Sequence, residues 1–231
     1  MPVDRFYLNA SLQGTVTITD TEHHHIHVLR LAIDETVELI NGQGDLAQAR
    51  IVEQTKSKTV LHILTTEHQP PPYPKLGVAI PLMRPSKLEW VLEKGTELGA
   101  DVFYLYTAEH SEKESLSEHQ RERLCAIAVA AMKQSGRLYL PHIEILPNLE
   151  AVFRCEAALY FGDVHPQSPW LQLQAEKSPF HLFITGPEKG FSEKEHALLT
   201  ERAKGRRLSH NILRAETAPI AALALLSVLV Q

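Results

Sequence analysis

The sequence predicts an α/β protein of two domains, a small N-terminal β-barrel and a larger C-terminal domain built on a parallel sheet. Its 231 residues, 44% of them hydrophobic, suffice for one or two folded cores. Four prolines between residues 70 and 74 favour an extended spacer, because proline cannot continue a helix or an inner strand. Short strand patterns precede this spacer, whereas strand and helix patterns alternate after it. We therefore assign residues 1–69 to the barrel, 70–75 to the linker and 76–231 to the α/β domain.

The N-terminal part is predicted to be mostly β, because its apolar segments are short and rich in Val, Ile and Thr. Asn41-Gly42-Gln43-Gly44 supplies residues that tolerate positive φ, as a tight hairpin turn requires. One short helix is expected at 21–29. Five strands in so short a segment favour a small barrel. The expected strands span 5–8, 15–19, 36–40, 46–53 and 59–64.

The C-terminal part alternates apolar strands with helices that open on capping signals, as in a parallel α/β sheet. Segments 86–89, 117–120 and 192–195 each place a serine three residues before Glu or Gln, the spacing of a capping box. The first helix is expected to end before Gly99, which can adopt the left-handed C′ conformation. The last helix, 218–230, is almost entirely apolar and is expected to be buried. The expected strands span 76–81, 102–107, 157–161 and 181–185.

Composition excludes several classes of protein. The net charge is −5, and acidic residues outnumber basic ones on both sides of the spacer, which argues against non-specific wrapping of nucleic acid. The two cysteines cannot build a disulfide framework. No signal-peptide pattern opens the sequence, and the longest apolar run, 218–230, is shorter than the about 20 residues of a membrane span. We expect a cytoplasmic protein with no membrane partner.

Two loops stand out as candidate ligand sites, because ligands bind beyond the carboxyl ends of parallel strands. Gly186 and Gly190 in loop 185–191 allow close backbone approach, but their spacing fits neither a Walker A motif nor a dinucleotide fingerprint. Taken alone, this loop is more simply interpreted as an ordinary strand-to-helix turn. In loop 208–217, Arg214 and Glu216 precede the apolar helix, where local sequence alone favours a salt-bridged cap.

Taken together, the two loops resemble a known family. Gly186-Pro187-Glu188-x-Gly190-Phe191-Ser192 and Ile212-Leu213-Arg214-Ala215-Glu216-Thr217-Ala218 resemble the C-terminal signature of the SPOUT class of RNA methyltransferases. Within that class the chain is most similar to the bacterial ribosomal RNA small subunit methyltransferase E family, the 16S rRNA uridine-N3 methyltransferases. Further family motifs are matched at 28–31, 94–100 and 134–141. The five fragments follow the family's order over nearly the whole chain.

The resemblance implies a C-terminal SPOUT domain with a deep trefoil knot and an N-terminal PUA-like barrel that binds RNA. Sequence rules alone would not suggest a knot, because chain connections are almost always unknotted. The family binds S-adenosyl-L-methionine in the knot, mostly through backbone groups, and works as a homodimer. The implied reaction is S-adenosylmethionine-dependent methylation of N3 of a specific uridine in 16S rRNA, on the 30S subunit.

The resemblance also implies site residues. Uridine N3 carries a proton on the Watson–Crick edge, so the base must be unpaired and must lose that proton. The Arg214 guanidinium is the candidate that stabilises charge on the uracil oxygens. Glu216 is the candidate base, or it orients Arg214, and a helix-terminus carboxylate without catalytic role is an equally good interpretation. The expected cofactor-binding residues are Leu159, Phe161, Gly162, Thr185, Gly186, Pro187, Glu188, Gly190, Leu208, Ser209, Asn211, Ile212 and Leu213. The expected RNA-binding residues are Arg5, His24, Arg30, Arg84, Lys87 and Arg137.

Three departures from the family pattern leave an alternative open. Lys189 and Ser209 stand where the family usually has glycine, and Asn211 stands where it has arginine. The alternative is a catalytically impaired RNA-binding or ribosome-assembly factor on the same fold. The histidines of segment 23–27 could supply metal ligands, but no carboxylate or cysteine pattern completes a site. No metal is therefore expected.

Overall fold

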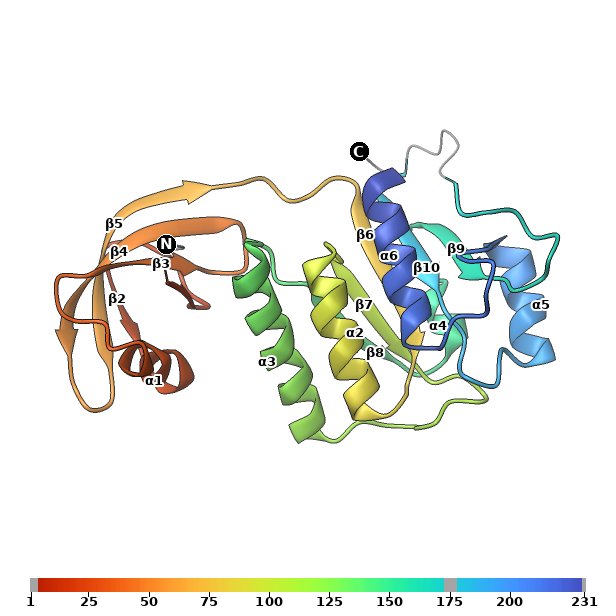
Figure 1. Ribbon diagram of the computed structural model, residues 1–231, viewed down its shortest axis with the longest axis horizontal. Coiled ribbons are helices and arrows are strands. Elements are labelled where there is room, and N and C mark those ends of the chain that lie inside the picture. Colours follow the sequence, from red (N-terminus) through yellow and green to blue (C-terminus); the bar gives the residue numbers. More distant parts are fainter. Residues whose placement is uncertain (1–3, 173–177, 230–231) are drawn as a thin grey trace. The chain divides into compact units, whose positions relative to one another are not determined.

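The computed structural model describes residues 4–172 and 178–229, and it forms two compact units (Figure 1). The division lies between Pro71 and Pro72, within the proline-rich spacer. Residues 132–140 group with the N-terminal unit, although sequence order places them in the α/β part. The reason is that Met132 and Leu138 form a buried cluster with Ile40, and Leu140 N–H donates to Gly42 O at 2.9 Å.

The N-terminal unit is a five-stranded sheet with one helix, as predicted. The strand order is β1-β3-β4-β5-β2, with β1 parallel to β3 and the other pairs antiparallel. Gly42 and Gly44 both have positive φ in the turn between β3 and β4, which confirms the predicted hairpin. Phe6, Leu39 and Ile26 are fully buried in the core beneath the helix. The elements are β1 (Arg5–Tyr7), β2 (Thr15–Ile18), α1 (Asp20–Val28), β3 (Thr36–Ile40), β4 (Asp45–Gln54) and β5 (Thr59–His68).

The second unit is built on a six-stranded parallel sheet of order β11-β9-β10-β6-β7-β8, which confirms the predicted α/β class. Four of its strands were expected from their apolar runs. Two were not, because edge strands need no continuous apolar run: β8 alternates exposed and partly buried residues, and β11 is Lys-Gly-Arg. The strands are β6 (Lys75–Pro81), β7 (Val102–Tyr106), β8 (His142–Leu146), β9 (Ala158–Gly162), β10 (Phe180–Ile184) and β11 (Lys204–Arg206).

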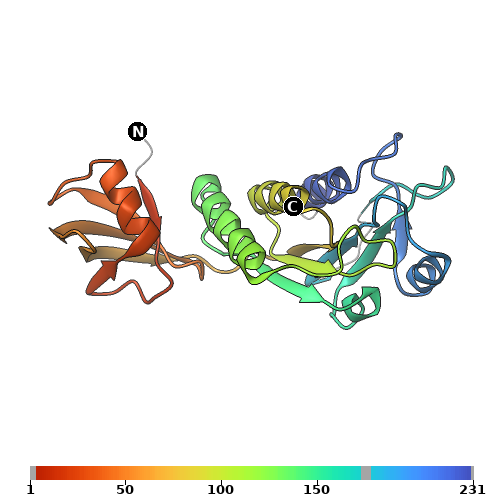
Figure 2. The same cartoon turned by 90° about the horizontal axis from the view of Figure 1, so that it is seen from below.

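Helices cover both faces of this sheet (Figures 1 and 2). On one face, Leu88 and Leu92 of α2 and Leu223 of α6 are fully buried against the sheet. On the other face, Val152 of α4 and Leu199 of α5 are fully buried. The helices are α2 (Pro85–Glu97), α3 (Glu118–Ser135), α4 (Leu149–Val152), α5 (Glu193–Arg202) and α6 (Thr217–Leu229). No helix within the described residues is long and apolar enough to cross a membrane.

Helix starts confirm two of the three predicted capping boxes. Ser192 and Glu195 exchange both reciprocal bonds at α5, and Ser117 and Gln120 do the same at α3. The prediction at Ser86 was wrong, because the N-cap of α2 is Arg84 and no side chain caps it. Pro85 occupies the first helical position with its φ already fixed, so α2 begins two residues before the start that the Ser86 signal predicted. Gly99 ends α2 with a φ of 92°, as expected, and Val230, the expected last residue of the C-terminal helix, lies outside the described residues.

Candidate active site

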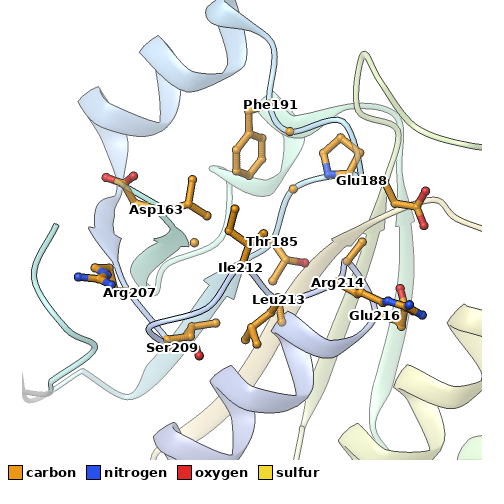
Figure 3. Close-up of a pocket in the computed structure, with 18 of the residues that line it drawn as sticks. Asp163, Thr185, Glu188, Phe191, Arg207, Ser209, Ile212, Leu213, Arg214 and Glu216 are labelled. Carbon is orange, nitrogen blue, oxygen red and sulfur yellow. The ribbon is translucent and has the colours of Figure 1, made fainter. Parts of the chain in front are cut away.

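A cavity of about 820 Å³ lies at the carboxyl ends of β9, β10 and β11 (Figure 3). Loop 185–191 and segment 206–218 form most of its wall, and the residues after β9 complete it. These segments are far apart in the sequence, and the parallel strand order places them at one edge of the sheet. The position and size are those of a ligand pocket in an open parallel sheet.

Most of the predicted site residues line this cavity. Both candidate catalytic residues, Arg214 and Glu216, are among them. Lys87, which the sequence assigned to RNA binding, also lines it. The predicted cofactor-binding residues in the wall are Gly162, Thr185, Gly186, Pro187, Glu188, Gly190, Leu208, Ser209, Asn211, Ile212 and Leu213.

Two predicted cofactor-binding residues, Leu159 and Phe161, do not line the cavity. Both pack in the hydrophobic cluster beneath α4 and α5, where Phe161 contacts Phe191 and His196 edge-on. The reason is the alternation of side chains along β9, which turns these two toward the helices. Only the end of the strand, at Gly162, reaches the cavity.

Loop 185–191 is anchored from several sides. Thr185 N–H donates to Ala79 O at 2.9 Å, and Tyr106 OH donates to Thr185 O at 2.7 Å. Burial, with the charge of Glu195, raises the pKa of Tyr106 well above its ordinary value, so its hydroxyl keeps the donated hydrogen. His110 Nδ1 lies 3.1 Å from Gly190 O. The loop is therefore anchored near both of its ends, at Thr185 and at Gly190.

Only Gly190 within this loop requires glycine for its backbone angle, because its φ is +79°. Lys189, Ser209 and Asn211 are absent from the described non-glycine residues with positive φ, which are Asp20, Arg30 and Asp34. The three departures from the family pattern thus impose no left-handed strain on either loop.

The far side of the cavity was largely missed from the sequence. Arg207, after the unpredicted strand β11, stacks on Trp170 at 4.7 Å, and Trp170 contacts His210 edge-on at 4.7 Å. Asp163 follows β9 and is also in the wall. Burial alone would raise the pKa of Asp163, but hydrogen bonds from Ser168 Oγ and the His165 N–H, with nearby histidines, lower it overall. The signal that could have found Asp163 and Arg207 is their place directly after parallel strands. The further residues in the wall are Val164, Lys189, Phe191, His196, Arg206, Ala215 and Ala218.

Arg214 and Glu216 lie on one side of the cavity with Glu188, opposite Asp163 and Arg207 (Figure 3). The Arg214 side chain is exposed and forms no ion pair within the described residues, so the salt-bridged cap suggested by local sequence is not formed. Its carbonyl oxygen instead accepts from two N–H groups at the start of α6. Glu216 Oε2 is buried without a hydrogen-bond partner in the part of the chain described.

The predicted RNA-binding residues are spread over both units. Arg5 forms an ion pair with Glu38 at 2.6 Å between β1 and β3. His24 and Arg30 are exposed on and after α1, and Arg84 is exposed beside Glu112. Arg137 lies in segment 132–140 and is half-buried. Their contact with RNA stays a prediction.

The histidine cluster of α1 forms no metal site. His23 is buried and its Nδ1 lies 2.8 Å from Thr59 Oγ1, a satisfied core position. Over residues 4–172 and 178–229, no three His, Cys, Asp or Glu side chains gather as ligands for a metal ion.

Comparisons with known proteins agree with this geometry. Residues 69–227 match the model of the RNA methyltransferase domain family, and residues 18–64 match that of the RNA methyltransferase PUA domain. The fold is thus that of a PUA-containing RNA methyltransferase. The chain belongs to the ribosomal RNA small subunit methyltransferase E family, as the sequence motifs predicted.

Individual relatives match over nearly their full length. The family member of Bacillus subtilis (strain 168) is 30% identical over 92% of this chain and 90% of its own. That of Rickettsia conorii is 30% identical over 97% of this chain and 95% of its own. A crystal structure of the Neisseria gonorrhoeae member bound to S-adenosyl methionine is 26% identical, with a TM-score of 0.86 and 98% coverage of both chains.

Proposed function

We propose that the chain is an S-adenosylmethionine-dependent methyltransferase that modifies N3 of a uridine in 16S rRNA within the 30S subunit. The observation that carries this proposal is the convergence of loops 185–191 and 206–218 on one cavity at the strand ends. The related Neisseria gonorrhoeae structure, which covers 98% of this chain, is bound to S-adenosyl methionine.

The cavity residues fit this cofactor. A volume of about 820 Å³ suits a ligand of nucleoside size. Val164, Leu208 and Leu213 offer apolar contacts, while the backbone of loop 185–191 offers hydrogen-bonding groups. The carboxylates of Glu188 and Glu216 suit a positively charged sulfonium. When bound, the sulfonium supplies an activated methyl group.

Two side chains are assigned to act on the uracil in this proposal. Glu216 lines the cavity and its side chain is 17% exposed, so its carboxylate can face the base and take the N3 proton. Arg214 is exposed and has no ion-pair partner there, so its guanidinium can reach a uracil oxygen as charge develops. With the cofactor held in this cavity, deprotonated N3 would be the nucleophile toward the sulfonium methyl group, and the sulfur would leave with the electron pair of its bond to that carbon.

The alternative of a catalytically impaired RNA-binding factor has less support. It rests on Lys189, Ser209 and Asn211, none of which adopts the left-handed backbone that would demand glycine. Asn211 removes one cationic group, but Arg206 and Arg207 also line the cavity and supply positive charge. The geometry therefore favours an active enzyme.

The proposal also includes a homodimer and a location in the cytoplasm. Trp90 of α2 and Leu225 and Val228 of α6 are exposed apolar residues on two helices that pack together. Such a surface supports the homodimer that the family resemblance implied. Three further features stay predictions: the trefoil knot, RNA binding by the PUA-like unit, and a cytoplasmic location.

The test is methylation of 30S subunits isolated from cells that lack the modification. The purified chain with S-adenosylmethionine should introduce one methyl group, which mass spectrometry of nuclease fragments locates at uridine N3. Transfer to a different base or to no base at all would contradict the proposal. Naked 16S rRNA and 50S subunits serve as controls for the requirement of an assembled 30S particle.

A further inference from the structure

Lys87, in the first turn of α2, lies among three carboxylates from three separate segments. Its Nζ forms a hydrogen bond with Glu188 Oε1 of the cavity loop. It also lies 3.6 Å from Glu112 Oε2 and 3.8 Å from Glu216 Oε2. All four side chains are half-buried or partly covered, so solvent screens these charges incompletely. The Lys87 ammonium thus lies close to three carboxylates at once.

The three carboxylates differ in the other groups, besides Lys87, that compensate or solvate their charge. Glu112 also accepts from Arg84 N–H at 3.3 Å and lies 3.4 Å from Arg84 Nε. Glu188 is the most exposed of the three and can be solvated. Glu216 has 17% side-chain exposure, and its Oε2 has no hydrogen-bond partner in the described chain. Lys87 is the cation paired with it there, at a distance beyond a direct hydrogen bond.

We propose that Lys87 is a positioning residue of the reaction, which balances the charge of the Glu216 carboxylate and orients it in the cavity. This inference rests on the proposed function and replaces the RNA contact expected for Lys87. A buried carboxylate without a nearby cation is costly to keep charged, and only the charged form can accept the N3 proton. The bond from Lys87 to Glu188 ties the cofactor loop to the same charge.

Glu112 competes with Glu216 for this ammonium. It draws Lys87 toward the loop after β7, where Arg84 already compensates its charge. Removing the Glu112 charge therefore leaves Lys87 more available to Glu216. This gives the inference two consequences of opposite sign, which a purely structural clamp would not produce.

The experiment is a double-mutant cycle on single-turnover methylation of 30S subunits at saturating cofactor. Glu216→Gln should lower the rate about 100-fold, the size typical of losing a general base. Lys87→Gln should lower it about 30-fold, and the double variant should match Glu216→Gln to within about threefold, because both changes act through one carboxylate. Cofactor affinity, measured by calorimetry, should change less than about threefold in Lys87→Gln.

Two further variants keep the test independent of folding. Lys87→Arg preserves the charge and should restore the rate to within about fivefold of the unaltered chain. Glu112→Gln should raise the rate about two- to threefold. The matched control is Lys94→Gln on the same helix, since Lys94 also serves two carboxylates, Glu93 and Glu97, but lies outside the cavity wall.

Several outcomes would overturn the inference. Multiplicative losses in the double variant would mean that Lys87 acts apart from Glu216. A higher KM for 30S subunits with an unchanged rate would return Lys87 to RNA binding. A tenfold loss in Glu112→Gln would indicate a structural clamp. Absence of methylation by the unaltered chain would instead remove the proposed function, and this inference would fall with it.

Discussion

The two walls of the cavity differ in how firmly the fold holds them. Loop 185–191 begins at Thr185, which is 1% exposed and hydrogen-bonded to residues of β6 and β7, and it ends at the capping box of α5. Segment 208–214 is open: Ile212 is 84% exposed, and Asn211 and Arg214 are exposed as well. A bond from Asn211 N–H to Ser209 Oγ at 3.1 Å is local to the segment.

This difference suggests a division of labour. A wall fixed by buried hydrogen bonds suits a cofactor that must be held in one orientation for in-line transfer. An exposed wall suits contact with a large substrate that arrives from solution. Accordingly, changes in loop 185–191 should act on cofactor affinity, whereas changes at Arg214 and Glu216 should act on the methylation rate.

Arg214→Ala tests the open wall and should have the largest effect. Loss of a group that stabilises developing charge typically lowers kcat about 100- to 1000-fold. Cofactor affinity by calorimetry should stay within about threefold, because the proposed contact is with uracil. Arg121→Ala, an exposed arginine of α3 outside the cavity wall, is the matched control. Equal losses of rate and cofactor affinity would remove the distinction between the walls.

Gly190→Ala tests the fixed wall. Alanine at a φ of +79° costs about 1–2 kcal/mol, although nothing lies within 4 Å of the added Cβ. If the loop relaxes to relieve this strain, the cofactor Kd should rise about tenfold. Gly14→Ala provides a matched control with a φ of +61° and equally open surroundings in the other unit. The control should lower thermal stability and leave the cofactor Kd unchanged, so equal changes in Kd would contradict the assignment.

Tyr106→Phe removes one anchor of the fixed wall. The change leaves the buried Thr185 carbonyl without the 2.7 Å bond and should lower the free energy of unfolding by about 1–2 kcal/mol. Cofactor affinity should fall severalfold with it. Tyr104→Phe on the same strand is the control, since no side-chain hydrogen bond of Tyr104 is found within the described residues. Chemical denaturation measures the free energy of unfolding, and calorimetry measures the cofactor affinity. Equal losses of both quantities in Tyr104→Phe and Tyr106→Phe would argue against this anchor.

Substitution of Asp163 should have the smallest effect, a change in how stability depends on pH in the acid range. Its pKa is lowered in the folded chain, so its contribution is present above the unfolded value of about 3.9 and is lost as pH falls through the folded value. Asp163→Asn should therefore flatten the fall in stability below about pH 4, as followed by thermal melts between pH 3 and 7. An unchanged slope would show that the hydrogen bonds from Ser168 and His165 do not favour the charged form.

Sequence patterns predicted the two fold classes and most elements because these follow from local periodicity and capping. They failed where tertiary structure decides: residues 132–140 join the N-terminal unit through contacts with Ile40 and Gly42, which no local pattern encodes. The short polar strand β11 was not predicted, because its sequence Lys-Gly-Arg contains no apolar run. Its absence from the prediction also concealed the role of Arg206 and Arg207 in the cavity wall.

The site itself was predicted from motif resemblance, because each loop alone suggested an ordinary turn or cap. The resemblance could not separate main-chain from side-chain positions, so Leu159 and Phe161 were included although their side chains pack beneath α4 and α5. It also assigned Lys87 to RNA binding, because the residue matches a cationic position of the family. The three carboxylates around Lys87 come from separate segments, so only the three-dimensional structure brings them together.

The most direct test of a fixed cofactor wall is calorimetric titration of the purified chain with S-adenosylmethionine, followed by S-adenosylhomocysteine. A preformed cavity predicts one binding site per chain with a micromolar Kd. In Gly190→Ala this Kd should rise, because the strained loop relaxes away from its binding shape. No heat of binding at millimolar ligand, in a chain shown to be folded, would contradict it. The RNA-binding factor would then become the favoured function.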